Sequence, residues 1–425
     1  MERRFEPAGR LAGRLRPPAD KSISHRAALI GAMADGETAV SNYLDSADTG
    51  STVAAVRALG SGVEAGAGGD LRIRGVGLRG APSAAIDVGN AGTLLRVLPG
   101  WLAGQPEGEW TLDGDDSIRR RPVDRVVEPL RLMGARVAAE DGRPPLRVAG
   151  APLSGIDYGL PVASAQVKSC LLLAGLLAEG ETAVAEPAPT RDHTERLLGA
   201  AGAEVSSDAG RIRVAPADGL APVEIAVPGD FSSAAFFLVA ALLVPGGEVT
   251  LEGVGLNPTR TGLLRVLERM GAAVEAEEEG ESGGEPAGSL RARHSELRAT
   301  EAGGDVIPLA IDELPLVALA GCFAEGTTVI RDAAELRRKE SDRIETVAAA
   351  LRAMGAEVET AEDGLAVTGT GGLRGGRVDA AGDHRIAMMA AVAALASREG
   401  ATVAGMEAAT VSYPGFEADL ARLAT

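Results

Sequence analysis

The chain has 425 residues, of which 45% are hydrophobic, 3% aromatic and 24% charged, with a formal net charge of −18 at pH 7. This acidic balance argues against nucleic acid and anionic membranes as partners, because both carry negative charge. It still allows a small anionic substrate, since a local basic cleft dominates the electric field inside it.

Features of the N-terminus and of the cysteines predict a cytoplasmic protein. The segment Met1 to Phe5 is followed by arginines and prolines rather than an apolar run, so we expect no signal peptide. No apolar run reaches the roughly 18 residues that a membrane span needs. Cys170 and Cys322 lie in apolar helical stretches, which is typical of buried free thiols in a reducing compartment.

Taken in chain order, the sequence repeats one pattern six times: a polar cluster, an apolar helix of about ten to fourteen residues, a turn and a β-type run. The turns begin at glycines that are 72, 72, 67, 79 and 74 residues apart, namely Gly36, Gly108, Gly180, Gly247, Gly326 and Gly400. This spacing indicates six copies of one α/β unit. The chain length alone allows two or three domains, and the six copies suggest two domains of three copies each.

A second landmark occurs in five of the repeats: an amphipathic helix that ends in a glycine, followed by an alternating strand. The glycines are Gly60, Gly134, Gly202, Gly271 and Gly355. No such segment follows Gly400. We therefore expect the N-terminal strand around Met1 to Leu15 to complete the last repeat.

The helix that follows each polar cluster is apolar almost all round, as in residues 170–177, 236–243 and 387–395. A helix without a polar face is buried on every side, so the pattern predicts helices inside each domain and strands outside. Helix amino ends carry unpaired N–H groups and a partial positive charge. Six such ends facing one cleft would suit a heavily charged anionic substrate.

One interruption, residues 275–305, contains an acidic run from Glu277 to Glu285 and lengthens its repeat. We interpret it as a solvated loop at a strand end. An acidic interaction segment is the alternative interpretation.

The polar clusters place lysine and arginine at helix starts, where the helix dipole opposes positive charge. Serine, asparagine and aspartate there are ordinary N-caps, but cations at the same ends indicate a bound anion. The three lysines of the chain, Lys21, Lys168 and Lys339, all lie in these clusters. Because an ammonium group can lose its proton and a guanidinium does not, we infer that Lys21 and Lys339 touch substrate or shuttle protons. The clusters span residues 21–26, 89–96, 164–169, 229–233, 311–315 and 382–385, with 119–122 and 337–343 beside them.

Two other kinds of site are not supported by the sequence. The four histidines, His25, His193, His294 and His384, form no i, i+4 pair and have no cysteine partner, which argues against a zinc site. No lysine follows a glycine, so the phosphate-binding loop of nucleotide kinases is missing.

The clusters together resemble the 5-enolpyruvylshikimate-3-phosphate synthase family of enolpyruvyl transferases, and the resemblance covers the whole chain. The motifs that carry it are residues 89–93, Arg121-Pro122, residues 339–343 and residues 382–385. The resemblance implies two inverse α/β domains of three βαβαββ units each, formed by residues 19–229 and by residues 1–18 plus 230–425. It also implies two crossings, near Pro18 and Gly229, and an active site in the cleft between the domains.

The family resemblance implies transfer of the carboxyvinyl group of phosphoenolpyruvate to the 5-hydroxyl of shikimate 3-phosphate, with release of phosphate. Because a carbon–oxygen bond is cleaved, no metal or other cofactor is expected. We also expect a monomer. By similarity, the residues that would bind shikimate 3-phosphate are Lys21, Ser22, Arg26, Ser164, Ala165, Gln166, Asp312 and Lys339. Those that would bind phosphoenolpyruvate are Lys21, Gly92, Arg121, Gln166, Arg343 and Arg385. The planar guanidiniums of the three arginines suit carboxylate and phosphate.

The implied reaction needs one proton removed from the hydroxyl and one delivered to the methylene carbon, followed by the reverse in elimination. We assign Asp312 as the base for the hydroxyl. Lys21 with Glu340 supplies the proton donors, and the division between these two stays open.

Two positions differ from the better-known members of the family. Residues 411–414 lack the lysine that many relatives carry before the aromatic–proline pair. By the resemblance, Arg191 would be a substitute charge at the shikimate site. Gly92 lacks the methyl group that alanine would place near phosphoenolpyruvate. We therefore expect the herbicide glyphosate to compete with that substrate.

Two alternatives remain. The sister enzyme that uses UDP-N-acetylglucosamine has the same fold but depends on a cysteine in a mobile loop, whereas both cysteines here are expected in buried helices. A repeat-built binding protein without catalysis would not need Asp312 beside Lys339 and Arg343.

Overall fold

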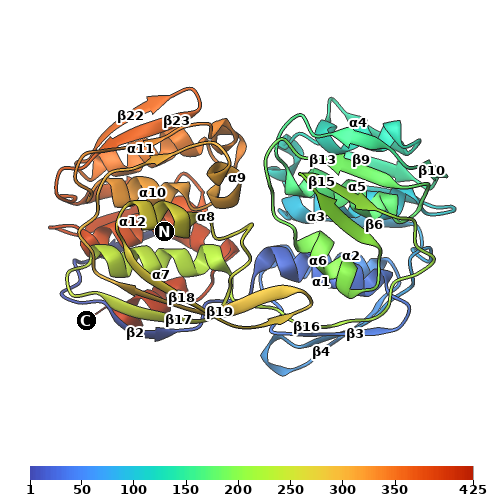
Figure 1. Cartoon of the computed structure of the whole chain (residues 1–425), viewed down its shortest axis with the longest axis horizontal. Helices are drawn as coiled ribbons and strands as arrows, with labels where there is room; N and C mark the ends of the chain where they lie inside the picture. The colour runs from blue at the N-terminus through green and yellow to red at the C-terminus, as the bar shows by residue number, and fades with distance from the viewer. Residues whose placement is uncertain (425) are drawn as a thin grey trace. The chain divides into compact units, whose positions relative to one another are not determined.

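The computed structural model describes residues 1–424 and divides the chain into two compact units (Figure 1). One consists of Ala19–Pro228 and Glu281–Glu285, and we call it the Lys21 unit. The other consists of Met1–Pro18, Gly229–Gly280 and Pro286–Thr425, and we call it the Asp312 unit. The chain thus passes from the Asp312 unit to the Lys21 unit near Pro18 and returns near Gly229. It enters the Lys21 unit once more for the short segment Glu281–Glu285 and then returns to the Asp312 unit.

The apolar helices predicted after the polar clusters are present and buried in the described chain. In α7 every residue is buried, and in α12 all but Arg385 and Ala396 are. In the Lys21 unit these helices are α1 (Lys21–Met33), α3 (Gly92–Ala103) and α5 (Ala165–Gly175). In the Asp312 unit they are α7 (Phe231–Leu243), α10 (Leu314–Gly321), which follows the short α9 (Val306–Ala310), and α12 (His384–Ala396).

Sheets lie outside these helices, and in the Lys21 unit they follow one plan. In each four-stranded sheet an edge strand pairs in parallel with its neighbour, and the remaining pairs are antiparallel. The orders are β16-β3-β5-β4, β6-β7-β9-β8 and β11-β13-β15-β14, with a separate pair β10-β12. The strands are β3 (Glu37–Ser41), β4 (Gly62–Ala65), β5 (Leu71–Arg74), β6 (Ala84–Asp87), β7 (Glu109–Asp113), β8 (Arg136–Glu140), β9 (Arg143–Ala149), β10 (Leu153–Ser154), β11 (Asp157–Gly159), β12 (Ala178–Glu179), β13 (Thr182–Ala185), β14 (Val205–Asp208), β15 (Arg211–Val214) and β16 (Glu224–Ala226).

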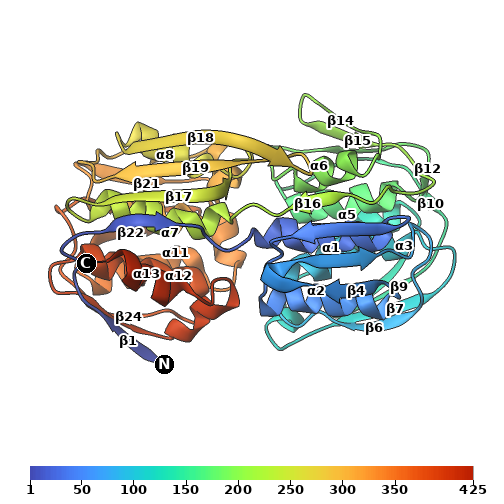
Figure 2. The same cartoon turned by 90° about the horizontal axis from the view of Figure 1, so that it is seen from below.

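The Asp312 unit has two four-stranded sheets, with the orders β18-β19-β17-β2 and β20-β21-β23-β22, and a three-stranded sheet of order β1-β25-β24. Figure 2 labels the four strands of the first of these sheets. The expected role of the N-terminal strand is half right. β1 pairs with β25 and completes the last repeat, but β2 pairs in parallel with β17 of the fourth repeat. The strands are β1 (Glu2–Phe5), β2 (Ala12–Leu15), β17 (Glu248–Gly255), β18 (Ala273–Ser282), β19 (Glu285–Arg293), β20 (Glu301–Ala302), β21 (Thr327–Ile330), β22 (Glu357–Ala361), β23 (Gly364–Thr368), β24 (Gly376–Asp379) and β25 (Ala401–Ala404).

The second landmark is confirmed, since amphipathic helices end at the predicted glycines. Gly60, Gly134, Gly202, Gly271 and Gly355 have φ of +90°, +94°, +85°, +79° and +94°, the left-handed conformation that glycine adopts without steric cost. The helices are α2 (Ala47–Ala58), α4 (Asp124–Leu132), α6 (His193–Ala200), α8 (Gly262–Arg269) and α11 (Arg343–Ala353). The chain also has α13 (Phe416–Leu423) and the short 3₁₀ segments η1 (Ala67–Gly69), η2 (Ile118–Arg120), η3 (Ala334–Arg338) and η4 (Met406–Val411).

The acidic segment is a β-hairpin, so the expectation of a solvated loop was wrong. Its strands β18 and β19 pair within the sheet of the Asp312 unit. Glu277 to Glu279 are exposed on β18 as an acidic loop would be, but Glu285 is buried. The alternation of buried and less buried residues along β19 is the signal of a strand.

Both cysteines are free and buried, as predicted. Burial raises the pKa of each thiol to about 12, so neither is a reactive thiolate at neutral pH. Among the described helices, none is long and apolar enough to cross a membrane.

A close crossing of α3 and α5 depends on Gly100. A Cβ at this position would lie 2.0 Å from the carbonyl oxygen of Cys170, a backbone atom that cannot give way alone. We expect Gly100→Ala to lower the free energy of unfolding by about 2–3 kcal/mol, because the two helices must separate. Urea unfolding followed by tryptophan fluorescence measures this, since Trp101 and Trp110 both lie in the same unit.

The matched control is Gly199→Ala in α6, where an added Cβ meets nothing within 4 Å. That substitution is expected to stabilise the unit by roughly 0.5–1 kcal/mol through helix propensity. Equal effects of the two alanines would contradict the close crossing.

Candidate functional site

Lys21 begins α1 and is held by a carboxylate from α2. Asp20 caps the helix by accepting a hydrogen bond from the Ile23 N–H at 2.8 Å. The Lys21 Nζ lies 3.0 Å from Asp48 Oδ2, and the lysine side chain is 25% exposed. The ammonium is therefore oriented and still open to solvent or a ligand. No motif in the sequence indicated a role for Asp48.

Arg26, one turn later on α1, is buried and linked to two other helices. Its Nε donates to Thr194 Oγ1 at 2.7 Å and its Nη2 donates to Ser169 Oγ at 2.9 Å. Its Nη1 donates to the Ser22 carbonyl at 3.0 Å. Burial lowers the pKa of Arg26 to about 10, an effect to which the nearby charge of Arg191 adds, while Glu195 opposes it. Arg26 is therefore charged at neutral pH and lies in the same electrostatic environment as Arg191.

Gln166 connects the first turns of α5 and α3. Ser164 is the N-cap of α5 and Ala165 its first residue. The Gln166 Oε1 accepts from Arg96 Nη1 at 3.1 Å, and its Nε2 donates to Thr93 Oγ1 at 3.2 Å. The side chain is thus fixed in one orientation.

Gly92, the first residue of α3, leaves room for two guanidiniums. A Cβ at this position would lie 2.8 Å from Arg121 Nη1 and 3.3 Å from Arg96 Nη1. Arg121 also donates from Nη2 to Asn90 Oδ1 at 3.0 Å. The missing side chain therefore allows Arg121 to lie against the start of α3.

These contacts bring the amino ends of α1, α3, α5 and α6 together within the Lys21 unit. Helix amino ends and guanidiniums both favour anions, and here they occur in the same group of residues. Of the sequence-predicted residues, this unit holds Lys21, Ser22, Gly92, Arg26, Arg121, Ser164, Ala165, Gln166 and Arg191. Lys168 differs from the other lysines: it is 1% exposed and pairs with Glu186 at 3.0 Å and Glu195 at 2.6 Å, as a structural cation does.

In the Asp312 unit, three cations surround one carboxylate. Asp312 lies between α9 and α10, with Oδ1 3.5 Å from Lys339 Nζ and 3.3 Å from Arg343 Nη1. Its Oδ2 lies 3.5 Å from Arg385 Nη2, and its carbonyl accepts from Arg385 Nη1 at 3.2 Å. The Asp312 side chain remains 11% exposed, so an incoming substrate could reach this carboxylate and the cations around it.

Arg343 is the buried centre of this cluster. Its Nη2 donates to Glu340 Oε2 at 2.6 Å, and its Nε donates to Asp383 Oδ2 at 2.8 Å. Burial alone would lower the pKa of Arg343, but the carboxylates of Glu340, Asp383 and Asp312 together raise it above the ordinary value. Asp383 shows the converse: burial favours a raised pKa, and the Arg343 charge holds the pKa below its usual value.

Asp383 also fixes Arg385. It caps α12 by accepting from the Arg385 N–H at 2.9 Å, and it accepts from Ser341 Oγ at 3.0 Å. The motifs 339–343 and 382–385 thus form one ion-pair network around Asp312.

A second group of polar residues, next to the Asp312 cluster, was not among the predicted site residues. Glu313 is buried, accepts from Ser232 Oγ, and lies 3.9 Å from Arg385 Nη1. Arg260 donates from Nη2 to the same serine at 2.8 Å. Glu313 and Ser232 belong to the polar clusters, and this membership could have indicated their place in the site. Arg260 lies outside the clusters, and its burial depends on tertiary packing that a local pattern does not show.

The histidine of the first polar cluster, His25, is held by a hydrogen bond and carries no charge. His25 is buried and bonded through Nδ1 to Thr52 Oγ1 at 2.6 Å. Burial lowers its pKa to about 3, so it is neutral at physiological pH. In residues 1–424 no group of three His, Cys, Asp or Glu side chains is arranged to hold a metal ion.

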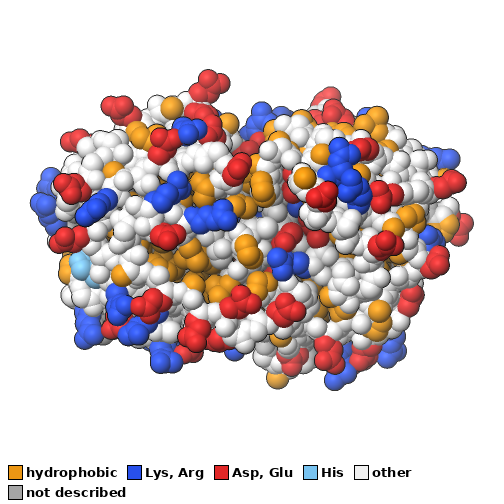
Figure 3. Space-filling view, in the orientation of Figure 1, with side chains coloured by type: hydrophobic (Ala, Val, Ile, Leu, Met, Phe, Trp, Pro, Cys, Tyr) orange, Lys and Arg blue, Asp and Glu red, His pale blue; other side chains and the backbone are white. Residues whose placement is uncertain are grey.

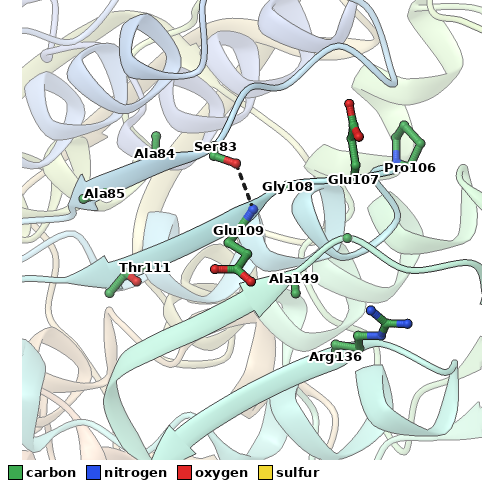
Figure 4. Close-up of a pocket in the computed structure, with 11 residues that line it drawn as sticks. Ser83, Ala84, Ala85, Pro106, Glu107, Gly108, Glu109, Thr111, Arg136 and Ala149 are labelled. Carbon is green, nitrogen blue, oxygen red and sulfur yellow. Dashed lines mark hydrogen bonds between the residues drawn. The ribbon is translucent and has the colours of Figure 1, made fainter.

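On the face in Figure 3 basic and acidic side chains are interspersed. Figure 4 shows a pocket on the sheet of β6, β7 and β9, where the Glu109 N–H donates to Ser83 Oγ at 2.9 Å. None of the sequence-predicted site residues lines this pocket.

Comparisons with known proteins agree over the whole chain. The family model described as EPSP synthase (3-phosphoshikimate 1-carboxyvinyltransferase) matches residues 5–420. The chain is 50% identical over 414 residues to a 3-phosphoshikimate 1-carboxyvinyltransferase of Acidithiobacillus ferrooxidans, covering 97% of this chain and 95% of that protein. It is 52% identical over 425 residues to one from Synechococcus sp. strain JA-3-3Ab, covering 99% and 96%. A solved structure of EPSP synthase from Acinetobacter baumannii is similar with a TM-score of 0.89 and 42% identity, covering 100% of this chain and 98% of that one.

Proposed function

Because this chain belongs to the EPSP synthase family, we propose that the Lys21 and Asp312 clusters together bind its two phosphorylated substrates. The activity is that of a 3-phosphoshikimate 1-carboxyvinyltransferase, which transfers the enolpyruvyl group of phosphoenolpyruvate to the 5-hydroxyl of shikimate 3-phosphate and releases phosphate. The observation that carries the residue assignment is the set of three cations around Asp312, the residue expected to accept the hydroxyl proton.

The assignment to shikimate 3-phosphate rests on the cations and hydroxyls of the Lys21 unit. The buried Arg26 and the neighbouring Arg191 supply positive charge, and Ser164 supplies a hydroxyl at the start of α5. The proposed set is Lys21, Ser22, Arg26, Ser164, Ala165, Gln166, Arg191, Asp312 and Lys339.

The assignment to phosphoenolpyruvate rests on guanidiniums with fixed orientations. Arg121 is held by Asn90, Arg343 by Asp383, and Arg385 by its contacts with Asp312. Planar guanidiniums suit a ligand that carries both a carboxylate and a phosphate. The proposed set is Lys21, Gly92, Arg121, Gln166, Arg343 and Arg385.

The chemistry follows from the residue types. Asp312 accepts the proton of the 5-hydroxyl as the oxygen bonds to C2 of phosphoenolpyruvate. Lys21 with Glu340 delivers a proton to the methylene carbon, which becomes a methyl group. In elimination the methyl group loses a proton, the carbon–oxygen bond to phosphate breaks, and the double bond reforms. Glu340 lies 2.6 Å from Arg343, so its carboxylate is oriented near the proposed phosphoenolpyruvate site.

We also infer that the protein works as a cytoplasmic monomer without nucleic acid or membrane partners. The acidic net charge of −18 supports the last part of this proposal, the lack of nucleic acid and membrane partners, since it repels both kinds of polyanion.

The test is release of inorganic phosphate from phosphoenolpyruvate by the purified protein. We expect release with shikimate 3-phosphate and none with shikimate or UDP-N-acetylglucosamine. Release with the nucleotide sugar alone would favour the sister enzyme. Binding of both substrates without release would favour a binding protein.

Gly92→Ala tests the assignment of Arg121 to phosphoenolpyruvate. The added methyl would displace the end of the Arg121 side chain, which can move without disturbing the fold. We expect the KM for phosphoenolpyruvate and the inhibition constant of glyphosate each to rise about tenfold, the equivalent of about 1.4 kcal/mol. Steady-state kinetics with each substrate varied in turn measures the change. An unchanged KM for phosphoenolpyruvate, or a wild type insensitive to millimolar glyphosate, would contradict the assignment.

A further inference from the structure

The tip of the β18–β19 hairpin is built to lie against α6 and β16. Its two-residue turn, Gly283-Gly284, has φ of +59° and +78°, as a tight hairpin turn with left-handed central residues requires. A Cβ at Gly283 would lie 3.2 Å from Leu197 and 3.4 Å from Ile225. Although the hairpin strands belong to the Asp312 unit, the contacts of residues Glu281–Glu285 assign this segment to the Lys21 unit.

Polar contacts fix the tip in this position. The Glu285 Oε1 lies 2.7 Å from His193 Nδ1, and both side chains are only 1% exposed. The Gly284 carbonyl accepts from Arg196 Nη1 at 2.7 Å, and Ser282 Oγ accepts from the Ala226 N–H at 2.7 Å. Burying a carboxylate is costly unless it is paired, so Glu285 is more than a solubilising charge of an acidic run.

In the first turn of α6, the residue after His193 contacts the proposed substrate site. His193 contacts the hairpin tip, whereas Thr194 accepts from Arg26 Nε at 2.7 Å and exchanges a hydrogen bond with Ser169 Oγ at 2.7 Å. Arg191 lies just before this turn. A shift of the turn by a fraction of an ångström therefore moves the Arg26 acceptor and the Arg191 backbone together.

We propose that Glu285 and His193 are positioning residues for shikimate 3-phosphate, because the hairpin tip holds the first turn of α6 and thereby Arg26 and Arg191. The inference rests on the proposed function, in which these two arginines bind that substrate. It assigns a role to a segment that the sequence presents only as an acidic insertion. Neither residue needs to touch the substrate, so the effect is on ground-state binding rather than on the chemical steps.

The experiment measures binding of shikimate 3-phosphate alone by isothermal titration calorimetry, and then the full kinetics. For Glu285→Ala and for His193→Ala we expect the dissociation constant to rise about five- to twentyfold, the equivalent of about 1–2 kcal/mol. The KM for phosphoenolpyruvate and the kcat at saturation should stay within about twofold of wild type. The double variant should be no worse than either single one, because the two side chains act as one pair.

Two further variants keep the test interpretable. Glu279→Ala removes an exposed carboxylate from the same hairpin and should leave shikimate 3-phosphate binding unchanged. If Glu285→Ala does not fold, Glu285→Gln keeps the shape but replaces the carboxylate that contacts His193 by a neutral amide, a weaker hydrogen-bond partner. A rise of about threefold in the dissociation constant is then expected. Folded variants that bind shikimate 3-phosphate as tightly as wild type would overturn the proposal, as would equal rises in both KM values.

Failure of the proposed function gives a different result. In that case the wild type itself would release no phosphate with shikimate 3-phosphate, or Arg26→Ala would bind this substrate normally. If both of these controls behave as expected while the Glu285 variants bind normally, only the hairpin proposal fails.

Discussion

Asp312→Asn is expected to lower kcat by about 10³-fold, within the range attributed to a positioned general base. Asparagine keeps the size of the side chain and can accept hydrogen bonds, but it cannot take the proton of the 5-hydroxyl. The carboxylate is held by Lys339 at 3.5 Å and Arg343 at 3.3 Å, which keep it oriented. The loss should therefore appear in kcat, with the dissociation constant of shikimate 3-phosphate changed by less than about tenfold.

The measurement is single-turnover formation of product at saturating substrates, beside calorimetric binding of shikimate 3-phosphate. The matched control is Asp332→Asn, an exposed aspartate of the same unit with φ of +62°, a conformation that asparagine also tolerates. It should keep wild-type turnover. If Asp312→Asn or Asp312→Ala turned over within tenfold of wild type with binding unchanged, Asp312 would not be the base.

The repeat architecture could be predicted because its signals are local. A glycine that ends a helix and a helix without a polar face each depend on a few neighbouring residues, and Gly134, Gly355 and α7 were placed correctly. The family resemblance, which rests on short motifs, is likewise confirmed, since the family model matches residues 5–420 and a relative is 50% identical over 414 residues. Local patterns also gave the correct state of Cys170, free and buried.

Strand order could not be predicted to the same extent. β16 pairs with β3, and β2 pairs with β17, across more than 180 residues of sequence. Nothing in a short alternating segment specifies which of several similar sheets it will join. The assignment depends on how the repeats close on one another, and this is why the N-terminal segment was assigned to only one repeat.

The partners of the site residues were also beyond local reasoning. Lys21 was recognised as special, but its contact with Asp48 arises from the packing of α1 on α2. Glu285 looked like part of a solvated acidic run, and its burial depends on the turn at Gly283 and on α6. A sequence shows which residue types suit the chemistry, whereas tertiary packing decides which of them are held in place.

Arg343→Met is expected to lower the stability of the Asp312 unit by about 3–5 kcal/mol, the usual cost of removing one partner from a buried ion pair. Methionine fills much of the volume but leaves Asp383, which is fully buried, without its cation. The Glu340 carboxylate loses its 2.6 Å partner as well. Binding of phosphoenolpyruvate should also be lost, because one of its proposed guanidinium ligands is gone.

The stability lost in Arg343→Met should depend on pH, and the pKa of Asp383 determines the direction of this dependence. In the wild type Arg343 holds this pKa below its ordinary value, although burial favours a rise, so the pair stabilises the fold above about pH 4 and the contribution fades as pH falls through the lowered pKa. In the variant the lowering effect of the Arg343 charge is absent, whereas burial and the neighbouring Glu340 carboxylate still favour a raised pKa of Asp383. Protonation on going from pH 8 to pH 5 then relieves the buried charge, so the stability gap between wild type and variant should narrow.

Differential scanning calorimetry and urea unfolding followed by circular dichroism measure this gap. Tryptophan fluorescence is an internal control, because Trp101 and Trp110 both lie in the Lys21 unit. Arg377→Met removes a cation of the same unit from an exposed pair with Glu2 and should cost at most about 1 kcal/mol. Equal losses for Arg343→Met and Arg377→Met, or a gap that widens toward pH 5, would mean that Arg343 does not neutralise a buried carboxylate.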